Sequence, residues 1–347
     1  MKKLKIGIIG VGGIADFYIS SLRDHAEAEV WAICDSNQEL LQKRGQELNI
    51  AEDRVYISYI EMLQNQELDA VMIGTPNFNH IAIAKDAVKY RMPFALEKPI
   101  ALYAEEAVGI CAELKASPMP HMICFSYRYK AAARYARELI QQGKLGKIYH
   151  VYSQYLQSWA NNEQLPLVWR FNKSLSGSGA LGDLGSHILD LHRFLVGDTH
   201  RVVADADTII HERTLLEGDG KGIVDVDDYC HVLAKMDNGI SSSMQISRFA
   251  NGRGNYQRIE VYGSKGSLVY TLEEHDSLEV CFTEDGNGQF ERVDIPEQYK
   301  ADQLQSFINI LKGKGDGLDA TVEDGYVNQR TLDAIVESFE KNSWITI

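Results

Sequence analysis

Residues 4–15 read Leu4-Lys5-Ile6-Gly7-Ile8-Ile9-Gly10-Val11-Gly12-Gly13-Ile14-Ala15, an apolar run followed by closely spaced glycines. The run predicts a buried β-strand, and the amphipathic residues after it predict a helix. A turn without side chains lets the main chain approach a pyrophosphate, and the N-terminus of the next helix offers amide donors. The spacing therefore predicts a dinucleotide-binding turn whose cofactor contacts are Gly10, Gly12, Gly13 and Ile14.

Asp35 supports this interpretation because it follows the second predicted strand, 20 residues after Ala15. A carboxylate at that place accepts hydrogen bonds from both ribose hydroxyls of NAD, whereas the 2′-phosphate of NADP meets a like charge. NAD is therefore favoured over NADP as the cofactor. The structural alternative is that Asp35 caps the helix predicted over residues 37–48.

Short apolar runs continue to alternate with helical stretches as far as residue 126. Strands are predicted at residues 4–9, 28–34, 55–57, 69–74, 94–96 and 121–125. Strands of this kind, separated by helices, are typical of a parallel sheet that is covered on both faces. The fold class is therefore α/β in this region, with a doubly wound Rossmann domain over residues 1–126.

The pattern changes in residues 127–347, which predict a second, α+β domain around an antiparallel or mixed sheet. A helix is predicted over residues 131–142, where Gly143 ends it, and another helix ends at Gly197. Strands of this second domain are predicted at residues 147–157, 229–236 and 244–249. A hairpin turn is predicted at residues 264–266 between two further alternating segments.

Polar residues follow the fourth and fifth predicted strands, where ligands of open α/β sheets bind. Lys98 there can hydrogen-bond a substrate oxygen and stabilise negative charge on it. The structural alternatives are a solvated Lys98 paired with Glu97, and a His80 that only caps the helix over residues 81–90. Cofactor contacts in these two segments are predicted at Thr75, Pro76, Asn77, His80, Glu97 and Lys98.

Asp183, His187 and Asp190 share one face of a predicted helix in the second domain, apart from its apolar stripe. A carboxylate four residues before a histidine can orient the imidazole and raise its basicity, which suits a general base. The structural alternative is an ordinary pair at a helix start. A metal site is also formally open, but no further His or Cys stands at ligand spacing on this face, and no metal is predicted.

Composition excludes several classes of function. The chain of 347 residues has 35 basic and 49 acidic residues, a net charge of −14, which disfavours nucleic acid as a partner. No apolar run is long enough to span a membrane, and no signal peptide is visible, so a cytoplasmic location is expected. The five cysteines are far apart among mostly apolar neighbours, as expected for reduced thiols without a disulfide frame or zinc site.

Taken together, these motifs resemble the Gfo/Idh/MocA family, the glucose-fructose oxidoreductase and inositol dehydrogenase group. The resemblance runs in order along nearly the whole chain, although the family's triple glycine reads Gly177-Ser178-Gly179 here. The matching segments are Gly10–Ala15, Thr75-Pro76-Asn77 with His80, Glu97-Lys98-Pro99, Tyr127-Arg128, Trp169-Arg170, residues 179–187, residues 260–266 and Glu323-Asp324-Gly325.

The resemblance implies NAD(P)-dependent redox chemistry at a hydroxyl group of a sugar, a sugar derivative or a cyclic polyol such as inositol. It also implies that the second domain has a large open, mostly antiparallel sheet, through which homodimers or homotetramers form. By position it assigns Lys98, Asp183 and His187 as the catalytic residues.

The expected reaction is hydride transfer between the nicotinamide and a secondary alcohol or carbonyl carbon. His187 is expected to accept the hydroxyl proton, Asp183 to hold His187, and Lys98 to bind the same oxygen. Two alternatives stay open: an NAD-dependent glycoside hydrolase that works by transient oxidation, and a non-catalytic cofactor-sensing partner protein. The substrate wall is predicted to contain Arg128, Trp159, Trp169 and Arg170.

Overall fold

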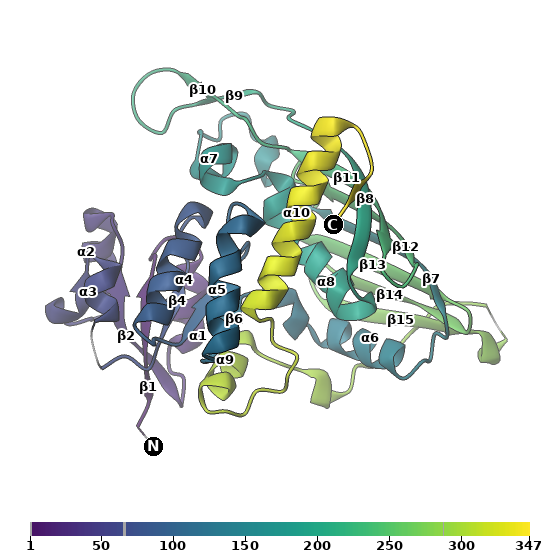
Figure 1. The fold of residues 1–347 in the computed structure, drawn as a ribbon, viewed down its shortest axis with the longest axis horizontal. Helices are drawn as coiled ribbons and strands as arrows, with labels where there is room; N and C mark the ends of the chain where they lie inside the picture. Colours follow the sequence, from purple (N-terminus) through teal and green to yellow (C-terminus); the bar gives the residue numbers. More distant parts are fainter. Residues whose placement is uncertain (1, 65–66, 287) are drawn as a thin grey trace. The chain divides into compact units, whose positions relative to one another are not determined.

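The computed structural model describes residues 2–64, 67–286 and 288–347. The chain forms two units (Figure 1). The first combines the residues up to Phe125 with Asp302–Val327, and the second combines Ser126–Ala301 with Asn328–Ile347. Residues 302–327, predicted to belong to the second domain, pack with the first unit.

The first unit contains the predicted parallel sheet, with strand order β3-β2-β1-β4-β5-β6. Its strands are β1 (Leu4–Ile9), β2 (Ala28–Cys34), β3 (Val55–Tyr56), β4 (Ala70–Ile73), β5 (Phe94–Leu96) and β6 (His121–Ile123). All neighbouring pairs are parallel. From β1 the chain adds strands toward one edge of the sheet as far as β3, and from β4 it adds strands toward the other edge. Ligands of open α/β sheets bind at this switch point between β1 and β4. The predicted doubly wound sheet is therefore confirmed.

Helices accompany this sheet, and one of them comes from far along the chain. They are α1 (Ala15–Leu22), α2 (Gln38–Glu47), α3 (Tyr59–Leu63), α4 (His80–Lys89), α5 (Ala104–Ala116) and α9 (Gln303–Leu311). Helix α9 contacts α1 and β6, although about 180 residues separate it from β6 in sequence (Figure 1). After α9, the main-chain N–H of Ile123 donates to the carbonyl of Ala320 at 2.8 Å, so the returning segment pairs with the end of β6.

The second unit contains a nine-stranded mixed sheet with order β16-β15-β14-β13-β7-β12-β11-β8-β17. Only β7 and β12 pair in parallel among these strands of the described sheet. The strands are β7 (Ile148–Leu156), β8 (Thr199–Asp207), β11 (Tyr229–Met236), β12 (Ser241–Ser247), β13 (Tyr256–Gly263), β14 (Gly266–Leu272), β15 (Asp276–Phe282), β16 (Glu291–Arg292) and β17 (Ile345–Thr346). The hairpin predicted at residues 264–266 is confirmed as the β13–β14 connection.

Burial in this sheet alternates with period two. On β11, for example, Cys230, Val232, Ala234 and Met236 are buried, while His231 and Leu233 are exposed. One face therefore packs against helices, as an antiparallel sheet with one covered face does. Helix α6 (Ala131–Gln141) contacts β14 and β15, and helix α8 (Ser186–Val196) contacts β7. Helix α7 (Lys173–Ser176) and a small hairpin of β9 (Glu212–Thr214) and β10 (Lys221–Ile223) complete this unit.

Helix α10 (Val322–Lys341) carries the chain from the first unit into the second, since the division falls after Val327. Its later part joins the large sheet, where the Ser338 hydroxyl accepts the main-chain N–H of Ala204 at 3.0 Å. Within the described residues, no helix combines the length and the hydrophobicity that a membrane span requires.

Candidate active site

The glycine turn between β1 and α1 has the form that a dinucleotide requires. Gly10 has φ +88°, and an added Cβ there would lie 2.8 Å from the main chain of Gly74. Only glycine meets both conditions without strain. At Gly12 and Gly13 an added Cβ would meet no atom within 4 Å, so this side of the turn is open to phosphate groups.

Asp35 lies against this turn. Its carboxylate accepts the N–H of Val11 at 2.9 Å and the N–H of Asn37 at 2.9 Å. Asn37, and not Asp35, caps α2, since its side chain accepts the N–H of Leu40. The capping alternative for Asp35 is therefore not what the structure shows. Asp35 instead connects the end of β2 to the glycine turn, where a ribose can reach its remaining lone pairs.

The segments after β4 and β5 carry the other predicted cofactor contacts. The hydroxyl of Thr75 is buried and has no hydrogen-bond partner among the described residues. Such an orphan polar atom is consistent with a missing ligand. Together with the open turn and Asp35, it shows that the residues present fit NAD. Pro76, Asn77 and Glu97 lie on the same two segments of the first unit.

His80 is buried, with 1% of its surface exposed, and both ring nitrogens contact carbonyl oxygens. Nδ1 lies 2.7 Å from the Pro99 oxygen, and Nε2 lies 2.8 Å from the Thr75 oxygen. Burial lowers the pKa of His80. This placement does not support the predicted direct cofactor contact, because both nitrogens are engaged with the main chain. His80 instead joins the segments that follow β4 and β5.

Asp183 and His187 lie at the entrance to α8 in the second unit. The sequence predicts an ordinary helix through Leu184, but residues Leu181–Gly185 form a π-helical turn, a form common at functional sites. Asp227 fixes the start of this turn. Its carboxylate accepts the N–H of Gly179 at 2.6 Å and of Leu181 at 2.7 Å. Asp227 was not predicted from the sequence, although its position directly before a second acid, Asp228, was an available signal.

His187 is 8% exposed and packs edge-on against Tyr127, with ring centroids 4.6 Å apart. The Tyr127 hydroxyl lies 2.6 Å from that of Tyr155, and the two hydroxyls lie 3.1 and 2.7 Å from Asn255 Oδ1. Gln157 Nε2 also donates to this oxygen, at 3.0 Å. Burial raises the pKa of both tyrosines, so their hydroxyls stay protonated. The sequence analysis missed this polar network because its members come from separate elements.

Arg128 was predicted to contact substrate, but its placement does not support that role. It is 5% exposed, and its guanidinium binds the buried carboxylate of Asp190 through Nη2 at 2.6 Å and Nε at 2.8 Å. This two-point pair connects the turn Ser126–Tyr129 to α8. Asp190 therefore forms an ion pair with Arg128. Burial raises the pKa of Asp190 although the arginine beside it acts in the opposite direction.

The other predicted wall residues are half-buried and lie in one region of the second unit. The Trp159 ring lies 5.6 Å from that of Phe171, and the Arg170 guanidinium stacks on Trp169 at 4.5 Å. Fully buried Arg213 on β9 holds this region, since Nη1 and Nη2 donate to the carbonyls of residues 160, 162 and 165 at 2.6–3.2 Å. The structure places Lys98 in the first unit and Asp183 and His187 in the second.

These features define a class first: an enzyme with an NAD-binding Rossmann unit and a second unit with a buried histidine in a polar setting. Comparison then identifies the family. A model described as "Oxidoreductase family, NAD-binding Rossmann fold" matches residues 4–125, and a "GFO/IDH/MocA C-terminal domain" model matches residues 133–269. The chain belongs to the Gfo/Idh/MocA family and is an NAD-binding oxidoreductase.

Its relatives include proteins whose names give a sugar or a polyol as the substrate. Levoglucosan dehydrogenase of Pseudarthrobacter phenanthrenivorans is 32% identical over 318 residues, 82% of this chain and 82% of that protein. Myo-inositol 2-dehydrogenase of Thermotoga maritima is 23% identical over 93% of this chain and 92% of that protein. A solved structure of levoglucosan dehydrogenase in complex with NADH and levoglucosan has a TM-score of 0.89 at 30% identity, covering 100% of this chain and 99% of that one.

Proposed function

We propose that this oxidoreductase interconverts a secondary hydroxyl and a carbonyl on a sugar, a sugar derivative or a cyclic polyol such as inositol. The observation that carries the proposal is His187, a buried imidazole beside a network of hydroxyl and amide groups. A general base set among such groups suits a substrate that has several hydroxyls. The named activities of the relatives support the same substrate class.

Bound NAD supplies the hydride acceptor or donor, its nicotinamide ring. His187 accepts the proton of the hydroxyl group that is oxidised, and Asp183 on the adjacent π-helical turn orients His187 and stabilises its protonated form. Lys98 follows β5 and places its ammonium at the same substrate oxygen, where it stabilises the developing negative charge. We assign the cofactor to Gly10, Gly12, Gly13, Ile14, Asp35, Thr75, Pro76, Asn77, Glu97 and Lys98.

The remaining substrate hydroxyls are proposed to bind polar and aromatic groups of the second unit. Tyr127 contributes from the network beside His187, and Trp159, Trp169 and Arg170 contribute from the region that Arg213 holds. Aromatic faces suit the C–H surfaces of a sugar, and Arg donates to hydroxyl groups.

The test measures NAD reduction against a panel that contains levoglucosan, myo-inositol and common aldoses. We expect Lys98→Ala and His187→Ala each to lower kcat by about 10²-fold while the Kd of NADH stays within a few-fold. A matched control is His231→Gln on the exposed side of β11, which should leave kcat unchanged. Near-normal turnover of either alanine variant would remove that residue from the mechanism.

The two alternatives predict different products. A hydrolase that uses transient oxidation gives no net NADH, whereas the dehydrogenase gives one NADH for each substrate oxidised. A cofactor-sensing protein binds NADH but turns over no member of the panel. The dehydrogenase is favoured because relatives over most of the chain are named dehydrogenases.

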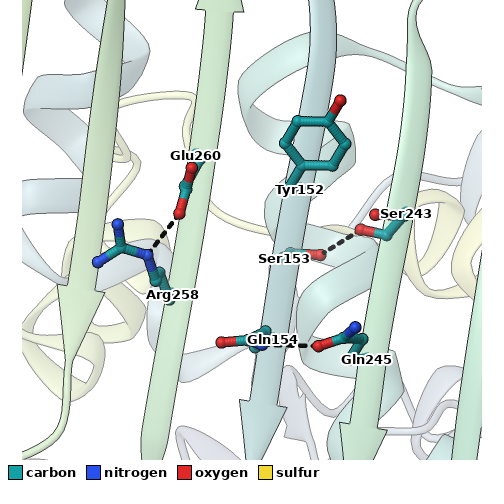
Figure 2. A pocket seen from close by; sticks show the side chains of 7 residues that line it. All are labelled: Tyr152, Ser153, Gln154, Ser243, Gln245, Arg258 and Glu260. Atoms are coloured by element: carbon teal, nitrogen blue, oxygen red, sulfur yellow. Dashed lines mark hydrogen bonds and ion pairs between the residues drawn. The ribbon is translucent and has the colours of Figure 1, made fainter.

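We also propose that the uncovered face of the large sheet binds a second copy of the chain, giving a homodimer or a homotetramer. Seven residues form a shallow hollow of about 260 Å³ on this sheet (Figure 2): Tyr152, Ser153, Gln154, Ser243, Gln245, Arg258 and Glu260. Gln154 donates to Gln245 at 2.6 Å, and Arg258 pairs with Glu260 at 2.6 Å. Donors and acceptors on one face suit a two-fold symmetric interface, where a donor of one copy meets an acceptor of the other and the reverse contact forms as well.

Light scattering after size-exclusion chromatography measures the mass in solution and so tests whether the chain forms a homodimer or a homotetramer. Tyr152 is 46% exposed and lies in the middle of β7, so Tyr152→Asp should convert the oligomer to monomers at micromolar concentration. Val108→Asp on α5, equally exposed at 51%, should leave the mass unchanged. A monomeric wild type would contradict the proposal.

A cytoplasmic location is part of the proposal as well, and the five free cysteines support a reducing compartment.

A further inference from the structure

Tyr18 on α1 reaches a segment that lies 79 residues further along the chain. Its ring is buried, with 1% of the surface exposed, and its hydroxyl donates a short hydrogen bond to Glu97 Oε1. The other oxygen of that carboxylate accepts the main-chain N–H of Lys98 at 3.2 Å. The Glu97 carboxylate therefore links the Tyr18 hydroxyl to the main chain of Lys98.

Packing fixes the direction of the Tyr18 side chain. Gly74, directly after β4, has no side chain, and an added Cβ there would lie 2.8 Å from Ile14 Cγ2 and 3.3 Å from Tyr18 Cε2. The ring thus passes the end of β4 to reach the end of β5. Because the interior around it is close-packed, its hydroxyl has few other positions available.

The surroundings keep the Tyr18 hydroxyl protonated. Cys124, 1% exposed, lies beside it and is also in hydrogen-bonding contact with Gln303 of α9. Burial and the charge of Glu97 raise the pKa of Tyr18 well above its usual value, and burial does the same for the Cys124 thiol. Tyr18 is therefore the O–H donor in its hydrogen bond to Glu97.

The same segment is also held from its other side. The carbonyl of Pro99 lies 2.7 Å from Nδ1 of buried His80, whose second nitrogen contacts the Thr75 carbonyl. Residues 97–99 are thus connected to α1 at one end and to α4 at the other. Two attachments on a three-residue segment restrict the main chain from which the Lys98 side chain extends.

We infer that Tyr18 is a positioning residue, which holds the Glu97 carboxylate and through it the main chain of Lys98. The inference rests on the proposed function, in which the Lys98 ammonium acts on the substrate oxygen. A hydrogen bond to a carboxylate is among the stronger ones in proteins, and small displacements of a reacting group lower rates by large factors. Tyr18 itself touches no reacting atom in this scheme.

Tyr18→Phe tests the inference because it keeps the ring and removes only the hydroxyl. Tyr59→Phe is the matched control, since Tyr59 donates to the Asp86 carboxylate at 3.0 Å between α3 and α4 of the same unit. We expect Tyr18→Phe to lower kcat by about 10-fold with the Kd of NADH, measured by fluorescence, within about 3-fold. Tyr59→Phe should keep kcat within about 2-fold and, because Tyr59 is less buried than Tyr18, lose no more thermal stability than Tyr18→Phe.

A double-mutant cycle shows whether the effect passes through Lys98. In the Lys98→Ala background, Tyr18→Phe should change kcat by less than about 2-fold. If Tyr18→Phe has normal turnover while Lys98→Ala is impaired, the positioning role of Tyr18 is wrong and the proposed function stands. The positioning role is also wrong if Tyr18→Phe lowers kcat by about 10-fold both in the wild type and in the Lys98→Ala variant. Normal turnover of Lys98→Ala would instead contradict the proposed function, and the route through Lys98 with it.

Discussion

Asp35 holds the glycine turn through Val11 and faces the place where an adenosine ribose binds in this fold. A 2′-phosphate at that place would meet the carboxylate at close range. We therefore expect the protein to bind NADH at least about 10-fold more tightly than NADPH, or about 1.4 kcal/mol. Calorimetric titration with both cofactors measures this preference.

Asp35→Ser should reduce that preference to within about 2-fold, mainly by weakening NADH binding. Glu39→Gln, which removes an exposed charge from the first turn of α2, is the control and should leave the ratio unchanged. Equal affinities in the wild type would show that Asp35 acts only on the turn.

His192 gives the second unit a pH-dependent stability. It is fully buried between the hydroxyls of Ser153 and Ser242, at 2.9 and 3.3 Å, and burial lowers its pKa to about 4. The unfolded chain takes up a proton at this histidine near pH ~6.5, whereas the folded chain does not until about pH 4. The free energy of unfolding is therefore highest above pH ~6.5 and decreases as the pH falls toward 4, by up to about 3 kcal/mol.

Urea unfolding at a series of pH values between about 7.5 and about 4.5 measures this loss. His192→Gln should have a flatter dependence than the wild type, because glutamine does not titrate. His231→Gln on the exposed face should keep the wild-type slope. Parallel curves for all three proteins would show that His192 does not contribute.

At the scale of single elements, the π-helical turn Leu181–Gly185 depends on Asp227. Asp227→Asn keeps the shape but offers one acceptor oxygen to two N–H groups, so one of them loses its partner in a buried place. We expect the unfolding free energy to fall by about 1–3 kcal/mol. We also expect kcat to fall, since the turn carries Asp183 into α8.

Asp225→Asn provides a close comparison. Asp225 is exposed and accepts the N–H of Lys173 at 2.6 Å, so it makes the same kind of bond two residues earlier. Its loss should cost well under 1 kcal/mol. If both variants had equal effects, the buried position of Asp227 would not be what stabilises the turn.

The elements differ in how well the sequence predicted them. β1, β2 and β5 begin and end at the predicted residues because their apolar runs have abrupt polar, glycine or proline boundaries. The turn at Leu181–Gly185 was not predicted, since an apolar stripe that begins inside it has the period of an α-helix. All four residues of this stripe are buried: Leu184, Ile188, Leu191 and Leu195. The carboxylate of Asp227 selects the different turn, and it lies more than 40 residues away in sequence.

Among site residues, those in local motifs were predicted and those that tertiary packing assembles were not. Asp35 and the glycine turn are close in sequence to the structure they form. The aromatic neighbours of His187, by contrast, come from the turn near residue 127 and from β7, and Asn255, which joins the two tyrosines, lies just before β13. The pairing of Arg128 with Asp190 on α8 was not predicted, because nothing local in the sequence indicates it.

At the scale of the whole molecule, the first unit needs the segment Asp302–Val327. Ala320 and Val322 belong to its buried core, and an added Cβ at Gly325 would lie 3.1 Å from Ile100. A fragment of residues 1–126 should therefore melt without cooperativity and bind NADH weakly. The same fragment joined by a flexible linker to residues 302–327 should melt cooperatively and bind NADH.

Circular dichroism and NADH fluorescence compare the two fragments directly. A linked fragment in which residues 302–327 are scrambled controls for added length. Cooperative melting and tight NADH binding by residues 1–126 alone would show that the returning segment is dispensable. The sequence analysis did not foresee this segment because an amphipathic helix such as α9 does not specify which sheet it covers.

The returning segment also determines when the first unit can finish folding during synthesis. Residues 126–301, 176 in all, must be translated after Phe125 before Asp302 appears. At 5–20 residues per second, this takes roughly 10–35 s, during which β6 and Ile100 stay uncovered on the nascent chain. Chaperones bind apolar surface of this kind. The nucleotide-binding unit, although encoded first, is completed only as the start of α10 leaves the ribosome.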